Sequence, residues 1–181
     1  MSRQLRAALL AAVVAVAVAG CGGGSSGGEL PPGPSLAPAA GSATASPSAS
    51  PGQLVLGSYL KFWDAVVAAN KASDPQLPAL ATAAADPQLS RVRKAIRVNR
   101  QQKLSLRGTV EHTPTLTKLA GAAATIEDCY DVSAWQPVNV TTGDKIDATD
   151  ANGTGRYRAR YTLRRSAGGW IVTDQVALGG C

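Results

Sequence analysis

The stretch Gly155-Arg-Tyr-Arg-Ala-Arg-Tyr-Thr-Leu-Arg-Arg165 decides the fold, because apolar and basic side chains alternate along it. The odd-numbered positions from 157 to 163 are apolar: Tyr157, Ala159, Tyr161 and Leu163. Four of the even-numbered positions are arginines: Arg156, Arg158, Arg160 and Arg164. Such a period of two is typical of a strand with one buried and one solvated face. Ala167-Gly168-Gly169 predicts a turn into a last strand, so this end of the chain is expected to form a β-hairpin.

Neighbouring segments predict the rest of a sheet. In the last strand, one apolar face is expected to hold four residues: Trp170, Val172, Val176 and Leu178. Upstream, apolar residues alternate from 104 to 110, and Pro114 is expected to break this run. Further strands are expected at 115–119, 122–130 and 135–140, and a loop is expected at 141–154. Glu127 and Asp131 share one parity, which predicts cross-strand pairing with the arginines. An anionic partner for the arginines is the alternative.

Helical periodicity precedes the strands. A helix is expected from Gln53 to Asn70, with an apolar stripe at the spacing i, i+3, i+4, i+7, i+8: Tyr59, Phe62, Trp63, Val66 and Val67. A short helical piece is expected at 77–84. Asp86-Pro87 then predicts the start of another helix that runs to about Gln102.

The expected helix that starts at Asp86-Pro87 has an apolar and a basic side. Its apolar stripe is Leu89, Val92 and Ile96. Beside it lies a basic run, Arg93, Lys94, Arg97 and Arg100, for which a solvated face is expected and a lipid headgroup or polyanion site is the alternative. Helices before strands predict an α+β domain, with helices packed on an antiparallel sheet of about four to six strands.

The first residues have the features of an export signal. Arg3 and Arg6 precede an uncharged run from Ala7 to Ala19, which as a helix spans about 20 Å, short of the ~30 Å membrane core. Val18-Ala19-Gly20-Cys21 resembles the bacterial lipobox, which implies a signal peptide at residues 1–20 and lipid attachment at Cys21. The expected location is therefore the extracytoplasmic face of the cell membrane, held by a lipid anchor. A transmembrane helix and an ordinary secretory signal are the alternatives.

The segment that follows Cys21 has a composition unsuited to a core. Of the thirty residues from 22 to 51, 26 are Gly, Ser, Pro or Ala, which predicts a disordered tether at 21–51 and one domain at 52–181. Removing Arg3 and Arg6 leaves 16 basic against 12 acidic residues, a net charge of +4. This mild balance has no basic cluster interleaved with aromatic residues, so no nucleic-acid partner is expected.

Three cysteines and one histidine limit the chemistry. With Cys21 lipidated, Cys129 and Cys181 remain in an oxidising compartment, which predicts a structural disulfide between them. No Cys-x-x-Cys motif favours redox activity. Two cysteines and one histidine are too few for a closed zinc site, and no Gly-rich phosphate loop links a strand to a helix. Neither a metal nor a cofactor is expected.

One carboxylate stands out as a catalytic candidate. Asp128 shares its parity with Ile126 and Tyr130, so it is able to face a cavity and act as a general acid or base. A structural role, in which Asp128 accepts from backbone donors or an arginine, is the favoured interpretation. His112 precedes Pro114 and is expected to be exposed at a strand end. The candidate cavity has five residues: Tyr59, Trp63, Asp128, Tyr130 and Tyr161.

Several short motifs carry a resemblance over nearly the whole chain. They are Tyr-x-x-Phe-Trp-Asp-Ala from Tyr59, Asp-Cys-Tyr-Asp from Asp128, Gly-Gly-Trp-x-Val from Gly168, the lipobox, the tether and Cys181. Together they resemble a group of uncharacterised actinobacterial lipoproteins, which is similar to the nuclear transport factor 2-like, cone-shaped fold. The resemblance implies helices in the mouth of a strongly curved antiparallel sheet, often as a homodimer. That superfamily holds enzymes and non-catalytic scaffolds, so the fold leaves function open.

The expected function is a non-catalytic, membrane-anchored module that binds a small apolar ligand in the cone or docks an envelope protein. Two alternatives stay open. One is an enzyme of the isomerase or cyclase type that uses Asp128. The other is a scaffold subunit without a ligand.

Overall fold

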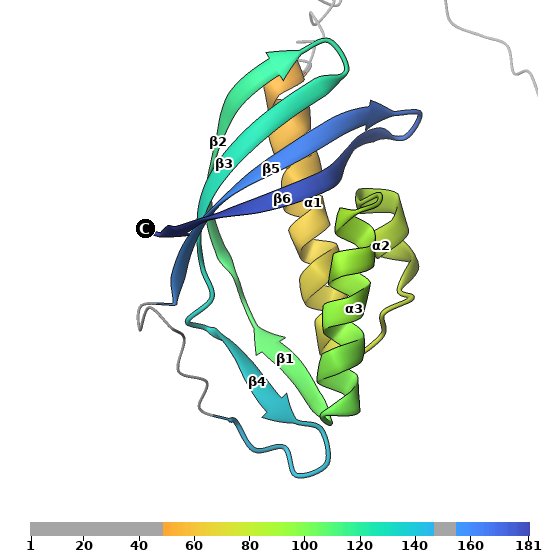
Figure 1. Ribbon diagram of the computed structural model, residues 1–181, viewed down its shortest axis with the longest axis vertical. Coiled ribbons are helices and arrows are strands. Elements are labelled where there is room, and N and C mark those ends of the chain that lie inside the picture. Colours follow the sequence, from red (N-terminus) through yellow and green to blue (C-terminus); the bar gives the residue numbers. More distant parts are fainter. Residues whose placement is uncertain (1–48, 147–154) are drawn as a thin grey trace, which may run out of the picture. The chain divides into compact units, whose positions relative to one another are not determined.

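A computed structural model of the chain describes residues 49–146 and 155–181 (Figure 1). The expected signal peptide, Cys21 and nearly all of the expected tether lie outside the described residues, as does the stretch 147–154 of the expected loop. In the described part, three helices are followed by six strands: α1 (Pro51–Ala72), α2 (Pro78–Ala83), α3 (Gln88–Gln101), β1 (Leu104–Gly108), β2 (Glu111–Ala120), β3 (Ala123–Asp131), β4 (Trp135–Asn139), β5 (Arg156–Ser166) and β6 (Gly169–Gly180).

Helix α1 starts two residues earlier than expected because Ser50 forms a capping box. The Ser50 hydroxyl accepts from the Gln53 backbone N–H at 3.3 Å, and the Gln53 side chain accepts from the Ser50 N–H at 2.7 Å. Four of the five residues of the predicted apolar stripe are buried, with Tyr59, Phe62 and Trp63 at most 7% exposed, and Val67 is half-buried. No helix in the described part is long and apolar enough to cross a membrane.

The strands form two antiparallel sheets. The larger has the order β2-β3-β5-β6 and the smaller pairs β1 with β4. Figure 1 shows the larger sheet bending around α1, while α2 and α3 lie beside α1. The predicted α+β class and the predicted β5–β6 hairpin are both confirmed.

The alternation along β3 and β5 assigns the two faces of the larger sheet as expected. Ile126, Asp128 and Tyr161 face α1 and are almost fully buried. On the outer face, Arg160 lies opposite Glu127 and donates to its Oε1 from Nε at 3.0 Å and from Nη2 at 2.8 Å. The predicted cross-strand pairing is therefore present at this pair.

The outer face also carries the disulfide. Cys129 and Cys181 are bonded, with their Cα atoms 6.1 Å apart and a sequence separation of 52. Since β5 lies between β3 and β6, the bond ties the end of β6 to β3 across one intervening strand. The predicted staple is confirmed.

Two strand expectations were wrong. Pro114 does not interrupt the sheet but lies inside β2, which is an edge strand and tolerates a residue without an N–H. Val176 does not share the buried face of Trp170 and Val172. Thr173 is an extra residue in β6, so the parity changes there and Val176, opposite Arg160, is 51% exposed.

The start of α3 also differs from the expected one. The helix begins at Gln88 rather than at Asp86-Pro87. The Asp86 carboxylate still accepts a hydrogen bond from the Ser90 backbone N–H at 3.0 Å, so it satisfies one donor of the first turn. The predicted apolar stripe packs inward, with Ile96 1% exposed and Leu89 and Val92 against the core.

Candidate functional site

Asp128 lies in the middle of β3, points towards α1 and is 1% exposed. Its Oδ2 accepts from the Tyr59 hydroxyl at 2.7 Å and lies 2.6 Å from His112 Nδ1. Its Oδ1 accepts from the Thr113 backbone N–H at 2.7 Å. A carboxylate is costly to bury without such partners, and here both oxygens have them.

Helix α1 supplies the polar groups that reach Asp128. Tyr59 and Trp63 are four residues apart and so project from the same side of the helix. Trp63 Nε1 donates to the Tyr59 oxygen at 2.8 Å, while the Tyr59 hydroxyl donates to Asp128. Burial, and next the nearby Tyr161, raise the pKa of Tyr59, so its hydroxyl stays a donor. The result is a chain of donors that ends on the carboxylate.

His112 is not exposed, contrary to expectation. Its side chain is 10% exposed and its ring centre lies 4.8 Å from that of Trp63. The reason is that β2 runs through Pro114, so His112 pairs with Tyr130 and faces the same side as Asp128. The alternation of His112, Pro114 and Leu116 was a signal that the proline obscured.

Half-buried aromatic residues surround the buried Trp63 ring. The Trp63 ring centre lies 5.1 Å from that of Tyr130 and 6.3 Å from that of Trp135, and the Tyr130 and Tyr157 centres are 5.9 Å apart. With His112 these rings form what we call the mouth cluster: Trp63, His112, Tyr130, Trp135 and Tyr157. Trp135 comes from β4 of the smaller sheet, so no local pattern indicated that it would join the others.

Two buried donors, one within the mouth cluster and one beneath it, have no acceptor in the described part of the chain. Tyr161 Oη and Trp135 Nε1 are buried and have no hydrogen-bond partner among residues 49–146 and 155–181. The Tyr161 ring centre lies 4.8 Å from that of Tyr59 and 6.3 Å from that of Trp63. Burial is the main cause that raises the pKa of Tyr161, so its hydroxyl keeps its proton. A buried donor without a partner costs about 1–3 kcal/mol, so an acceptor supplied by a ligand would be stabilised at these two atoms.

The five predicted cavity residues come together. Tyr59, Asp128 and Tyr161 are buried beneath the mouth cluster, and Tyr59 contacts both of them as well as Trp63. Tyr130 lies at its half-buried rim. Burial is the main cause that raises the pKa of Tyr130. The inner part of this site is therefore packed, and only its aromatic rim is open to solvent.

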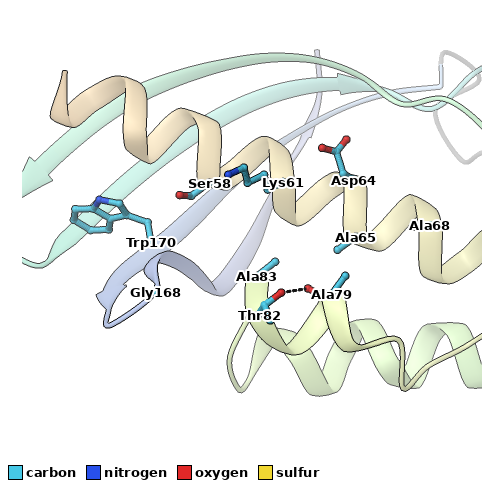
Figure 2. A pocket seen from close by; sticks show the side chains of 10 residues that line it. All are labelled: Ser58, Lys61, Asp64, Ala65, Ala68, Ala79, Thr82, Ala83, Gly168 and Trp170. Atoms are coloured by element: carbon cyan, nitrogen blue, oxygen red, sulfur yellow. Dashed lines mark hydrogen bonds between the residues drawn. The ribbon is translucent and has the colours of Figure 1, made fainter. Parts of the chain in front are cut away.

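A separate groove lies between α1 and α2 and has a volume of about 480 Å³ (Figure 2). Alanines from both helices line it, Lys61 and Asp64 of α1 also line it, and Trp170 of the β5–β6 hairpin stands at one end. None of the predicted cavity residues lines this groove. The groove exists because the side chains of α1 and α2 that face it are mostly small and do not fill the space between the helices.

Metal-ligating side chains do not gather in the described part of the chain. Within residues 49–146 and 155–181, no three His, Cys, Asp or Glu side chains lie close enough to hold a metal ion. His112 and Asp128 form the one His–carboxylate contact within that part.

Comparisons with known proteins give likeness of fold. No family model and no curated protein matches the chain. The intermembrane space region of a chloroplast protein is similar at 14% identity, over 74% of this chain and 100% of that one, with a TM-score of 0.48. A nuclear transport factor 2-like protein from Cytophaga hutchinsonii is similar at 12% identity, over 68% and 97%, with a TM-score of 0.43.

A third solved structure is a phospholipid-binding protein from Ralstonia solanacearum in complex with a phospholipid. It is 13% identical, the match covers 69% of this chain and 78% of that one, and the TM-score is 0.36. At sequence identities this low, the likeness concerns only the arrangement of helices and strands.

Proposed function

We propose that the chain is a lipid-anchored, extracytoplasmic binding protein whose mouth cluster holds a small, mainly apolar ligand. The observation that carries this proposal is the pair of buried donors, Tyr161 Oη and Trp135 Nε1, beside half-buried aromatic rings. A ligand that accepts from these donors removes their desolvation cost on binding. Aromatic walls with a few directed polar groups are typical of small-molecule sites.

The geometry favours a particular ligand chemistry. Trp63, Tyr130 and Trp135 offer ring faces and edges, which pack best against a flat or ring-shaped apolar body. Tyr161 Oη and Trp135 Nε1 are donors, so the ligand needs acceptor oxygens, as in a carbonyl or an ether. We therefore expect a ring compound with one or two acceptor oxygens and no charge.

The anchor is the second part of the proposal. It rests on Val18-Ala19-Gly20-Cys21, which resembles a lipobox. Lipid on Cys21 and a tether of low apolar content would keep the domain beside the extracytoplasmic face of the membrane. The mass of the N-terminal peptide from exported protein tests it, since the anchor adds acyl chains to Cys21 and a Cys21→Ala variant lacks them.

We propose a non-catalytic role because Asp128 has no free oxygen. Tyr59, His112 and the Thr113 N–H occupy both of its oxygens. One observation favours the alternative of acid–base catalysis of the isomerase or cyclase type, namely the 2.6 Å contact between His112 Nδ1 and Asp128. An Asp128→Asn variant separates the two at a temperature where it stays folded. An enzyme loses turnover, while a binder keeps most of its affinity.

Native mass spectrometry of the exported mature chain tests ligand binding. We expect extra mass that leaves on denaturation in the wild type, and much less of it in Trp135→Phe and Tyr161→Phe, which keep an aromatic ring at each position but remove the donors. Trp170→Phe is the matched control, because Trp170 lines the groove instead of the mouth cluster. A wild type without extra mass would contradict the ligand and favour an envelope protein or a second copy as the partner. The same spectrum shows a homodimer directly.

A further inference from the structure

Helix α3 has an unusual charge composition. Its fourteen residues include five cations and no acidic residue: Arg91, Arg93, Lys94, Arg97 and Arg100. Within the described part, only Arg91 among them forms an ion pair, with Asp174 of β6. From Arg93 to the end of the helix, positive charge is therefore not balanced by any direct contact among those residues.

The cations occupy one side of α3. At about 100° per residue, Lys94 and Arg97 lie about 160° and 100° around the helix from the buried Ile96. Arg93 and Arg100 lie between Arg97 and Ile96, at about 60° and 40°. Lys94, Arg97 and Arg100 are exposed in the structure, while Arg93 is half-buried. Val98, which is 40% exposed, adds an apolar group next to them. We call Lys94, Arg97 and Arg100 the basic face.

The helix C-terminal end gains further charge from α1. Asn99 Nδ2 donates to Asn70 Oδ1 at 3.4 Å, which brings the end of α1 alongside α3. Lys71, the exposed neighbour of Asn70, lies at this end. Lys103 lies two residues beyond the end of α3 and is exposed as well.

The C-terminal carbonyls of α3 favour Arg100, which lies in the last turn, but they do not explain the rest of the basic face. Like charges three or four residues apart on a helix destabilise it, and both the Lys94–Arg97 and the Arg97–Arg100 spacings are of this kind. Packing of α3 is supplied by Leu89, Val92 and Ile96 on the other side. An anionic surface in contact with the basic face would attract these cations and offset their mutual repulsion.

We propose that the basic face of α3 docks on the surface of a bilayer that contains anionic phospholipids. This inference rests on the proposed lipid anchor, because the anchor is what places the domain beside a membrane. The 27 residues from 22 to 48 span up to about 90 Å when extended, so the linker length allows α3 to reach the bilayer. A lipid chain together with a basic patch holds a protein more firmly than either one, and it also orients the domain.

Vesicle sedimentation tests the docking without help from the anchor. The probe is the mature chain with Cys21→Ser, mixed with vesicles of phosphatidylcholine alone or of equimolar phosphatidylcholine and phosphatidylglycerol. We expect binding to the anionic vesicles alone, weakened by added salt. The triple variant Lys94→Gln, Arg97→Gln, Arg100→Gln should bind about 100-fold more weakly, at roughly fivefold for each cation.

A matched triple variant removes the same charge elsewhere. Arg158→Gln, Arg164→Gln and Arg165→Gln change exposed residues of β5, away from α3, and should alter binding less than about threefold. Equal loss in both triple variants would overturn the proposal, because it would mean attraction to net charge alone. Absence of binding to anionic vesicles would overturn it as well. The acyl mass on Cys21 of the wild type is read separately, so failure of the anchor is distinguishable from failure of the docking.

Discussion

Asp128 and Glu127 are consecutive carboxylates on β3, and the two faces of the sheet treat them differently. Asp128, on the inner face, is 1% exposed and is held by Tyr59, His112 and a backbone N–H. Glu127, on the outer face, has a side chain 32% exposed and bonds to Arg160, whose side chain is 51% exposed. Water competes for the outer pair but not for the inner network. The same chemical group is therefore expected to be structurally essential on one face and nearly neutral on the other.

Removal of the disulfide is expected to have the largest effect on stability. It is the exception to the contrast between the two faces, because Cys129 lies on the outer face. Replacing both Cys129 and Cys181 with Ser should lower the free energy of unfolding by about 4 kcal/mol, because the bond closes a loop across 52 positions. Urea denaturation of the variant and of the oxidised wild type measures the difference. A loss below about 1 kcal/mol, a quarter of the entropic value, would show that the outer face contributes little even through a covalent bond.

Asp128→Asn probes the inner face directly. The amide keeps the shape of the side chain but cannot accept from Tyr59 and His112 as the carboxylate does, so we expect a loss of about 3 kcal/mol in the free energy of unfolding. Thermal and urea denaturation should agree on the value. A change as small as that of a surface carboxylate would remove the distinction between the two faces.

Two tyrosines that touch each other sharpen the contrast within the inner face. Tyr59→Phe removes a donor to Asp128 and the acceptor of Trp63 Nε1, so the free energy of unfolding should fall by about 2 kcal/mol. Tyr161→Phe removes a buried hydroxyl without a partner in the described part, so stability should stay the same or rise by about 1 kcal/mol. Equal losses in the two variants would mean that Tyr161 Oη is satisfied in solution.

Alkaline pH tests the same tyrosines without mutation. Burial raises the pKa of both Tyr59 and Tyr161 above the usual value of 10.0. The unfolded chain then releases these protons above pH 10 while the folded chain keeps them. Stability is thus fully present below pH 10 and falls above it, by about 1 kcal/mol per pH unit for each group. Stability of Tyr161→Phe, measured by urea denaturation from pH 9 upward, should decline less steeply than that of the wild type. Parallel declines would contradict burial of its proton.

Glu127→Gln should have the smallest effect, no more than about 0.5 kcal/mol, because an exposed ion pair gains little over two solvated charges. Added salt should shrink the difference further. The measurement is a urea denaturation of Glu127→Gln in parallel with Asp128→Asn, which changes the next residue in the sequence. A loss comparable with that of Asp128→Asn would show that the outer ion pair is a major support of the sheet.

Sequence patterns predicted the elements whose faces differ strongly in polarity. The alternation from Arg156 to Arg164 assigned both faces of β5, and the shared parity of Glu127 and Cys129 placed them on the outer face of β3. The aromatic stripe of α1 was likewise readable, because its members recur at helical spacing. In each case a local period reports directly on which side is buried.

Other features depend on contacts that no local period encodes. Val176 reversed its side because one extra residue, Thr173, changes the parity of β6. Trp135 joins Trp63 from a different sheet, and only the path of the chain through β4 brings them together. His112 was misplaced because proline is usually a strand breaker, an inference that fails at the edge of a sheet.

That edge has a consequence for how the protein behaves when it is crowded. Strand β2 is one border of the larger sheet, and it holds Pro114, an irregular register between Leu116 and Lys118, and the exposed charge of Lys118. Each of these features hinders the addition of a foreign strand. Aggregation through open sheet borders is a hazard wherever molecules collide often. Strand β2 is built so that frequent collisions do not lead to β-sheet polymers.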